Sequence, residues 1–406
     1  MIFPFAAYRA RLLVGNAISG ASYPEEFKSV LSLDAEERAL EIISAWDGYG
    51  ETPLVPLGGL AAAAGVGQVL YKQEAGRFGL GSFKALGGAY AVYQLLAGMV
   101  AERTGSEPTP EALMAGNCSD LTSAVTVCCA TDGNHGRSVA WGARMFGARS
   151  VIFIHETVSE ARAGAIASYG AQVVRVRGNY DDSVREAARV AETEGWHVVS
   201  DTSYPGYTGV PRNVMQGYGV MAGEAGRQLG EAKPTHIFIQ GGVGGLAAAV
   251  TAHFWEALGP QAPRVIVVEP EAAACLLESS KAGEPTGVGG GLETIIAGLA
   301  CGEPSIIAWP ILHAGVSAFM SIPDEAAEEA MRLLASGDAG ARLVGGESGV
   351  AGLAGFLVAA CRTDWRAALG LDETSIVLCF GSEGDTDAAL YAQIVGKTAA
   401  EVEASA

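Results

Sequence analysis

Short β-branched runs alternate with glycine or polar turns and then with alanine-rich runs, and this alternation constrains the fold more than any other feature. Strands alternating with helices form parallel sheets, with functional residues at the carboxyl ends of the strands. We therefore predict an α/β fold with two sheet systems. The expected strands are residues 124–130, 150–154, 172–176, 197–200, 236–240, 264–268 and 375–380, the expected helices are 138–146, 159–169, 180–194 and 246–258, and a loop is expected over 105–120.

The composition allows a sizeable core and argues against several kinds of partner. The 406 residues are 49% hydrophobic and 17% charged, so one large or two modest domains are expected. A net charge of −19 disfavours binding to nucleic acid or to an anionic membrane. The chain shows neither a signal peptide nor an apolar run long enough to span a bilayer. Seven scattered cysteines fit a reduced cytoplasmic protein, and the six histidines do not cluster as metal ligands, so no metal is predicted.

Lys84 is one of only six lysines, and it lies in the stretch GSFKALGGAY (residues 81–90). This stretch predicts the start of a glycine- and alanine-rich helix. Burial and the positive helix end both disfavour an ammonium, so the amine becomes nucleophilic and suited to a Schiff base. A lysine extended along the surface explains this stretch equally well when it is taken alone.

The glycine loop GGVGG (Gly241–Gly245) lies between a predicted strand and a predicted helix. Its backbone N–H groups and the helix dipole suit a phosphate. The segment Gly242–Ala247 also fits the dinucleotide pattern G-x-G-x-x-A, with Glu269 placed where a ribose-binding acid is expected. A phosphate cradle, a dinucleotide site and a structural turn all remain open on this stretch.

Polar residues follow three other predicted strands. The segment TDGNHG (residues 131–136) contains Asp132 and Asn134, Asp201 ends the last strand of the first set, and Ser382 follows the run 375–380. The Asn134 amide suits a polar ligand edge, and Ser382 suits a ring nitrogen. Turns and helix caps are the structural alternative at each place. No Ser/His/Asp triad is indicated, and His135, which follows Asn134, is assigned no catalytic role.

Taken in order, the lysine, the Gly-Asn-His-Gly loop, the glycine loop and the strand-end serine resemble fold-type II pyridoxal-phosphate (PLP) enzymes, the superfamily of tryptophan synthase β and threonine dehydratase. From about Gly50 to Val395 the chain is similar to the 2,3-diaminopropionate ammonia-lyases. The similar stretches are Arg77–Tyr90, Ala130–Arg137, Asp201–Tyr207, Gln216–Tyr218, Val268–Pro270, Ala297–Pro304, Gly346–Gly349 and Ser382–Asp387. Asp132 is the most discriminating residue, since serine and threonine dehydratases usually carry serine there. The chain departs from the family at Lys72-Gln-Glu-Ala75 and slightly in its glycine loop.

The resemblance implies α,β-elimination of 2,3-diaminopropionate to pyruvate and two ammonia, with PLP held by Lys84 as a Schiff base. Lys84 would remove the Cα proton of one enantiomer and Asp132 that of the other. Asp132 and Asp201 would pair with the second ammonium of the substrate. The residues implied to bind the cofactor are Lys84, Phe83, Asn134, Gly241, Gly242, Val243, Gly244, Gly245 and Ser382.

The resemblance also implies an architecture. It consists of two open twisted parallel-type sheets flanked by helices, with the cofactor in the cleft between two domains. The large domain would comprise residues 1–91 and 205–406 and the small one residues 92–204. A homodimer is implied, and Cys275 and Cys301 would lie near one another at the site entrance, where a reversible disulfide is a hypothesis.

Three alternatives remain at this point. The first is the same chemistry on another β-substituted amino acid, such as serine, threonine, a hydroxyaspartate or an aminosugar acid. The second is an NAD-dependent dehydrogenase that uses Gly242 and Glu269. The third is a non-catalytic binding protein that has kept the fold.

Overall fold

The computed structural model describes residues 3–15, 20–131, 133–156, 158–178 and 180–405. The chain divides into two compact units. Unit 1 comprises Met1–Leu33, Glu51–Gly76 and Met221–Ala406, and unit 2 comprises Asp34–Gly50 and Arg77–Val220. Each unit is built on a sheet of its own, so each is described separately.

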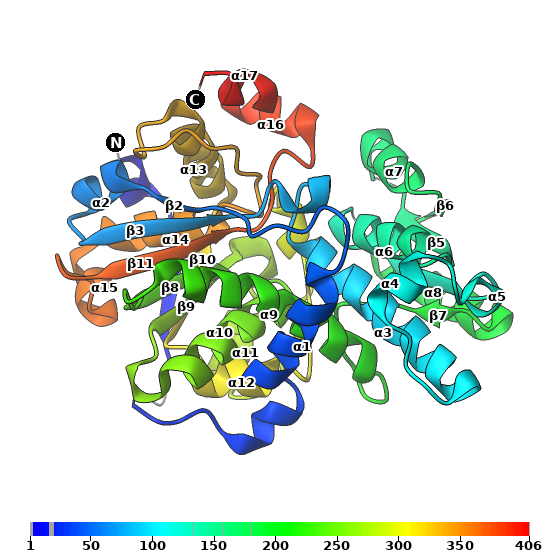
Figure 1. Ribbon diagram of the computed structural model, residues 1–406. Coiled ribbons are helices and arrows are strands. Elements are labelled where there is room, and N and C mark those ends of the chain that lie inside the picture. Colours follow the sequence, from blue (N-terminus) through cyan, green and yellow to red (C-terminus); the bar gives the residue numbers. More distant parts are fainter. Residues whose placement is uncertain (1–2, 16–19, 132, 157, 179, 406) are drawn as a thin grey trace. The chain divides into compact units, whose positions relative to one another are not determined.

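Unit 1 contains a seven-stranded sheet of order β1-β10-β9-β8-β11-β3-β2 (Figure 1). The five inner strands are parallel, whereas β1 and β2 pair antiparallel at the two edges. The carboxyl ends of β8, β9 and β11 therefore meet at one edge of the sheet. The strands are β1 (Arg11–Val14), β2 (Leu54–Pro56), β3 (Gln68–Gln73), β8 (His236–Gln240), β9 (Arg264–Pro270), β10 (Ala318–Ile322) and β11 (Ile376–Gly381).

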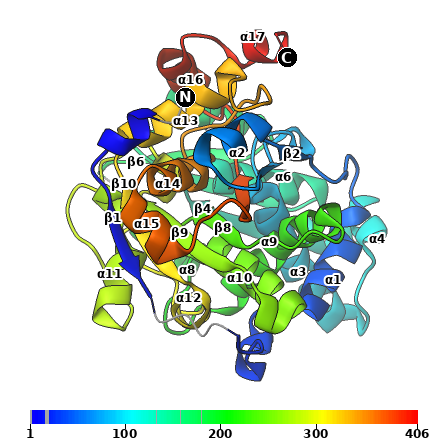
Figure 2. The ribbon, with the colours of Figure 1, turned by 90° about the vertical axis from the view of Figure 1, so that its left-hand side faces the viewer.

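Helices cover both faces of this sheet (Figures 1 and 2). The fully buried helix α14 packs on β8, β9, β10 and β11, and α10 contacts β8 from the other face. Gly355 permits the close approach of α14, because a Cβ there would lie 2.6 Å from Val268 Cγ2. The helices of this unit are α2 (Gly58–Ala64), α10 (Gly245–Leu258), α11 (Cys275–Ala282), α12 (Trp309–Gly315), α13 (Asp324–Ser336), α14 (Ala351–Ala360), α15 (Thr363–Leu369), α16 (Ala388–Val395) and α17 (Ala399–Glu403), and α9 (Gly209–Leu229) runs from unit 2 into it.

Unit 2 contains a parallel four-stranded sheet of order β6-β5-β4-β7. Phe153 on β5 packs in the cluster that includes Ala187 of α8, whereas Ile152 faces Gly136 of α6. Because side chains alternate along a strand, α6 and α8 cover opposite faces. The elements are β4 (Thr126–Ala130), β5 (Arg149–His155), β6 (Gln172–Val176), β7 (His197–Val198), α1 (Leu33–Ser44), α3 (Lys84–Thr104), α4 (Pro110–Met114), α5 (Ser119–Thr122), α6 (Asn134–Met145), α7 (Glu160–Ala167) and α8 (Tyr180–Glu194).

Glycines hold α3 tightly against α6. A Cβ on Gly142 would lie 2.8 Å from Ala89 Cα, and one on Gly88 would lie 2.3 Å from Ser138 Oγ. The Ser138 hydroxyl donates to the Lys84 carbonyl oxygen at 2.7 Å and accepts from the Ala89 N–H at 3.1 Å. The beginning of α3, and with it Lys84, is thereby fixed to α6.

The predicted fold class is confirmed, and each of the seven predicted strands ends within two residues of an observed one. The loop expected over 105–120 is wrong, because α4 forms there. The Thr109 side chain caps this helix by accepting from Ala112 N, and Pro110, which has no N–H to satisfy, occupies the first turn. The predicted small domain, residues 92–204, lies within unit 2, and its boundaries remain a prediction.

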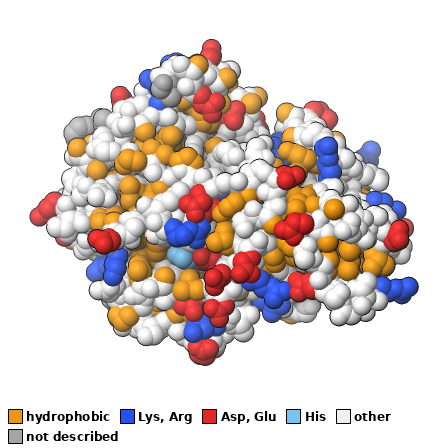
Figure 3. All heavy atoms as spheres, in the orientation of Figure 1, with side chains coloured by type: hydrophobic (Ala, Val, Ile, Leu, Met, Phe, Trp, Pro, Cys, Tyr) orange, Lys and Arg blue, Asp and Glu red, His pale blue; other side chains and the backbone are white. Residues whose placement is uncertain are grey.

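Charged side chains are spread over the surface. On the face in Figure 3, basic side chains lie scattered among acidic ones. In the part of the chain that the structure describes, we find no helix both long and apolar enough to cross a membrane.

Candidate active site

Lys84 begins α3 and is held against a carboxylate. Its Nζ lies 2.5 Å from Asp201 Oδ2, and the two side chains are 19% and 17% exposed. The same Nζ lies 5.4 Å from the ring centroid of Phe83 and 5.6 Å from that of Tyr218. The alternative of a lysine extended along the surface is therefore wrong, since the amine is enclosed by two aromatic rings and a counter-ion.

Asp201 follows β7 and is anionic at neutral pH. Burial raises the pKa of this carboxyl, but Lys84 and His135 outweigh the effect and hold the pKa well below its ordinary value. For His135 the effect of burial has the opposite sign: it lowers the pKa of the imidazole, whereas the charge of Asp201 raises it. Unit 2 thus brings together two predicted site residues, Lys84 and Asp201. His135, for which no catalytic role was predicted, lies beside them.

The loop between β4 and α6 is closed by a residue that the sequence analysis missed. Thr131 Oγ1 accepts hydrogen bonds from the N–H groups of Gly133 at 3.0 Å and Gly136 at 3.2 Å. A threonine just before a Gly-rich helix start is the signal that could have revealed it. Asn134 is the first residue of α6. The predicted base Asp132 lies outside the described residues.

The glycine loop connects β8 to α10, as predicted. Gly244 has φ +98°, and a Cβ there would lie 2.8 Å from Leu312 Cδ1. A Cβ on Gly241 would lie 2.5 Å from Val267 Cγ1. The Val243 carbonyl accepts from Ser305 N at 2.8 Å. The loop leaves no room for side chains at these glycines and ends at Gly245, the first residue of a 14-residue helix, which fits an anion such as a phosphate.

Ser382 follows β11 and is oriented by Gln240 at the end of β8. Gln240 Nε2 donates to the Phe380 carbonyl at 2.9 Å and to Ser382 Oγ at 2.5 Å. A carbonyl can only accept, so the amide nitrogen, not the oxygen, faces both groups. Ser382 Oγ therefore accepts one hydrogen bond, and its own proton is available to a ring nitrogen.

Glu269 does not have the surroundings of a ribose-binding acid. Its side chain is fully buried and accepts from Leu276 N at 2.7 Å and Leu277 N at 2.8 Å, in the first turn of α11. Burial raises the pKa of Glu269 to about 8, against the opposing effect of the two N–H groups. The dinucleotide interpretation is wrong on this point, because its acid caps a helix.

Cys275 and Cys301 both lie beside Gly242. Cys275 Sγ lies 3.6 Å from the Gly242 carbonyl oxygen, and Cys301 Sγ lies 3.3 Å from the place of a Cβ on Gly242. Neither forms a disulfide in the structure. The reversible disulfide remains a hypothesis.

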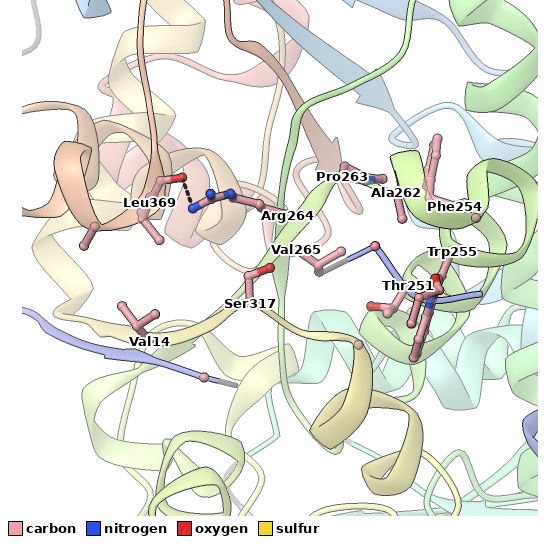
Figure 4. Close-up of a pocket in the computed structure, with 16 residues that line it drawn as sticks. Val14, Thr251, Phe254, Trp255, Ala262, Pro263, Arg264, Val265, Ser317 and Leu369 are labelled. Atoms are coloured by element: carbon pink, nitrogen blue, oxygen red, sulfur yellow. Dashed lines mark hydrogen bonds between the residues drawn. The ribbon is translucent and has the colours of Figure 1, made fainter. Parts of the chain in front are cut away.

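Unit 1 also has a pocket of about 210 Å³, which lies near the amino ends of β9 and β10 (Figure 4). Val265 at the start of β9, Ser317 just before β10 and Trp255 of α10 line it. Figure 4 shows the hydrogen bond that Arg264 donates to the Leu369 carbonyl at the edge of the pocket. None of the described candidate residues lines this pocket, so it is separate from the sheet edge that carries the glycine loop and Ser382.

Comparison with known proteins agrees with this chemistry. The family described as "Pyridoxal-phosphate dependent enzyme" matches residues 45–380. The chain belongs to this family.

Its full-length relatives narrow the assignment further. The diaminopropionate ammonia-lyase of Escherichia coli (strain K12) is 40% identical over 358 residues, which cover 86% of this chain and 88% of the relative. That of Salmonella typhimurium (strain LT2) is 40% identical over 361 residues with the same coverage. A crystal structure of the holo E. coli lyase matches with a TM-score of 0.87 and 35% identity, covering 96% of this chain and 97% of that one. The chain is thus a PLP-dependent enzyme of the diaminopropionate ammonia-lyase family.

The residues present fit PLP on structural grounds. Lys84 supplies a partly buried amine, the glycine loop presents backbone without side chains because Cβ atoms there would clash, and Ser382 has a hydroxyl proton to donate. The comparisons support the cofactor, and the residue assignments remain predictions.

Proposed function

We propose that this enzyme catalyses the PLP-dependent α,β-elimination of 2,3-diaminopropionate to pyruvate and two ammonia. The observation that supports this proposal best is the Lys84–Asp201 pair, in which an amine meets an anionic carboxylate at 2.5 Å in a buried setting. An amine is needed to bind the cofactor and to move a proton. A carboxylate is needed to bind a substrate with a second ammonium.

Each predicted cofactor-binding residue would have a role in holding the cofactor. Lys84 would bind its aldehyde carbon, Phe83 would pack beside the ring, and Asn134 would bind the ring hydroxyl. The loop Gly241–Gly245, including Val243, would bind the phosphate through backbone N–H groups. Ser382 would donate to the pyridine nitrogen. A neutral hydroxyl need not keep that nitrogen protonated, which favours elimination over transamination.

The substrate-binding roles follow from charge. PLP, when bound, supplies an electron sink for the negative charge that develops at Cα. Lys84 would take the Cα proton from one enantiomer and Asp132 from the other. Asp201 would pair with the second ammonium once Lys84 is engaged elsewhere. A carboxylate at these positions favours a cationic β-substituent over the neutral hydroxymethyl of serine.

The first experiment compares pyruvate release from D- and L-2,3-diaminopropionate, serine and threonine. Turnover of at least one diaminopropionate enantiomer, with little from the hydroxy amino acids, is expected. A yellow protein that ignores diaminopropionate would overturn the substrate and leave the cofactor in place, and would move attention to the alternative of another β-substituted amino acid.

Asp132→Ser tests the origin of specificity. If charge pairing selects the substrate, the variant shifts its preference toward serine and threonine. An unchanged ratio of substrates would contradict that role. The matched control is Asp120→Ser, which replaces an exposed aspartate in α5 and is expected to leave the ratio unchanged.

We further propose that the enzyme is a cytoplasmic homodimer with a large domain of residues 1–91 and 205–406 and a small domain of 92–204. Family resemblance supports the dimer, and the composition of the chain supports the cytoplasm. Sedimentation equilibrium of the holoenzyme tests the dimer: a species of the monomer mass, 41.6 kDa, at micromolar concentration would contradict it.

A further inference from the structure

The two ring nitrogens of His135 have different surroundings. Nε2 lies 2.8 Å from the Val199 carbonyl oxygen. Because a carbonyl can only accept, Nε2 carries the hydrogen, and Nδ1 of the neutral ring presents a lone pair. Nδ1 is buried and has no hydrogen-bond partner among the described residues. It faces Asp201 Oδ2 at 3.9 Å.

The same carboxylate oxygen also faces Lys84. Asp201 Oδ2 lies 2.5 Å from Lys84 Nζ, so one oxygen lies between an amine and an imidazole nitrogen. Lys84 and His135 are the two groups that place a positive charge beside this carboxyl when they are protonated. Tyr218 and Cys129 also face it, and they ionise only to anions. His135 is therefore the group able to replace the charge of Lys84.

We propose that His135 is a positioning residue that takes up, on Nδ1, the proton that Lys84 gives up when its amine is used to bind the cofactor. The inference rests on the proposed role of Lys84. An N–H bond of the ammonium breaks and its proton passes to Asp201 Oδ2, which releases a proton to His135 Nδ1. The amine ends neutral, the imidazole ends cationic, and the carboxylate is unchanged. Closing 3.9 Å to hydrogen-bond length needs a movement of about 1 Å.

Charge explains why the proton is held there. A buried carboxylate without a cation is costly, so the loss of the Lys84 charge favours a new cation beside Asp201. Burial lowers the pKa of His135, the charge of Lys84 lowers it further, and Asp201 raises it. Once Lys84 is neutral, its opposing effect disappears and that of Asp201 remains. His135 is then neutral while Lys84 is charged, and charged while Lys84 is neutral.

His135→Gln separates this role from a structural one. A glutamine amide can donate to the Val199 carbonyl as Nε2 does, but it has no titratable nitrogen facing Asp201. His236→Gln is the matched control. His236 is also buried, and its Nε2 bonds to the Leu369 carbonyl at 2.9 Å, in unit 1 on the amino-end side of β8. In both variants the structural hydrogen bond survives and a histidine is lost.

The measurement uses the holoenzyme. Borohydride reduction and peptide mapping first establish whether Lys84 carries the cofactor; a label elsewhere overturns the proposed role of Lys84. The visible absorbance of the cofactor is then titrated with pH in wild type and both variants. In His135→Gln, Asp201 lacks its compensating cation and favours a proton on Lys84 Nζ. The midpoint is therefore expected to rise by about one pH unit, with the rising limb of kcat moving the same way.

Each outcome decides the proposal. A shift in His135→Gln, with none in His236→Gln, supports the role of His135. If the midpoint of the absorbance titration in His135→Gln equals that of wild type, the role of His135 is overturned. This holds even when peptide mapping shows that Lys84 carries the cofactor. If His135→Gln fails to fold, ¹⁵N-histidine NMR of wild type decides instead. One histidine should change from singly to doubly protonated when the cofactor is bound, and no change would overturn the proposal.

Discussion

Gln240 and Ser382 join the ends of β8 and β11 through a hydrogen bond of 2.5 Å in which the glutamine amide donates and the serine hydroxyl accepts. The direction of this bond matters more than its length. With its oxygen already accepting, Ser382 is left as a donor toward any group above the sheet edge. Gln240 is thus the residue that sets the hydrogen-bonding role of Ser382.

Gln240→Glu should reverse that role. A carboxylate cannot donate, so Ser382 would give its proton to residue 240 and present only an acceptor to the cofactor. We expect kcat/KM to fall about tenfold or more, the worth of one buried hydrogen bond. Steady-state kinetics on Gln240→Glu, Ser382→Ala and the double variant check this. The two changes should be non-additive, and fully additive losses would contradict the coupling.

Gly244→Ala should weaken cofactor binding and destabilise the fold. The position has φ +98°, and the new Cβ would lie 2.8 Å from Leu312 Cδ1. Strain and overpacking together should cost about 1–3 kcal/mol and displace the loop. Fluorescence titration of the cofactor should show a dissociation constant raised about tenfold or more.

Gly230→Ala is the control for this prediction. Gly230 also has a positive φ, of +60°, but nothing lies within 4 Å of its added Cβ. This variant should lose stability through backbone strain and still bind the cofactor as wild type does. Equal cofactor affinity in both alanine variants would show that the Gly244 loop does not contact the phosphate.

Residues 172–176, 180–194 and 236–240 could be predicted from sequence to the residue, because each is either a short run rich in β-branched residues or an amphipathic helical run, with clear turn residues at its ends. The edge strands β1 and β2 and the inner strands β3 and β10 were missed. The edge strands are short and pair antiparallel, so the βαβ rhythm carries no signal for them. The partner of β1 is β10, which lies far away in the chain.

The candidate site was predictable where function requires an unusual residue type in an unusual place. Lys84 stood out among few lysines, and the glycine loop stood out between a strand and a helix. Gln240 and His135 were not assigned a role because each acts through a neighbour, Ser382 or Asp201. Gln240 and Ser382 are 142 residues apart, and His135 is also distant in sequence from Asp201. Such pairs become visible only when the strands are assembled.

The buried ion pair of Lys72 and Glu224 should be essential to stability. Lys72 Nζ lies 2.8 Å from Glu224 Oε2, and both side chains are fully buried. Lys72→Met would leave a buried carboxylate without this cation, at a cost of about 3–5 kcal/mol in the free energy of unfolding. Urea unfolding measures it, and Lys72→Met/Glu224→Gln should recover part of the loss.

The exposed pair of Lys281 and Glu278 provides the comparison. Its side chains are 45% and 30% exposed, with Nζ 3.1 Å from Oε1. Lys281→Met should change the unfolding free energy by less than about 1 kcal/mol, since water solvates both charges. Similar losses for the two lysine variants would contradict the argument from burial.

His236 should make the fold sensitive to acid. Burial lowers the pKa of His236 below its ordinary value of 6.5, the Leu369 carbonyl opposes this, and Arg264 adds to it. Below pH 6.5 the unfolded chain binds a proton that the folded chain resists, so stability present above that pH is lost as pH falls toward the folded pKa. His236→Gln keeps a donor for Leu369 and removes the titration. The drop in urea midpoint between about pH 7.5 and 5.5 should therefore be smaller in His236→Gln than in wild type. His313→Gln, at an exposed position in α12, is the control and should show the same drop as wild type. If His236→Gln loses as much stability with acid as wild type does, the acid sensitivity arises from other groups.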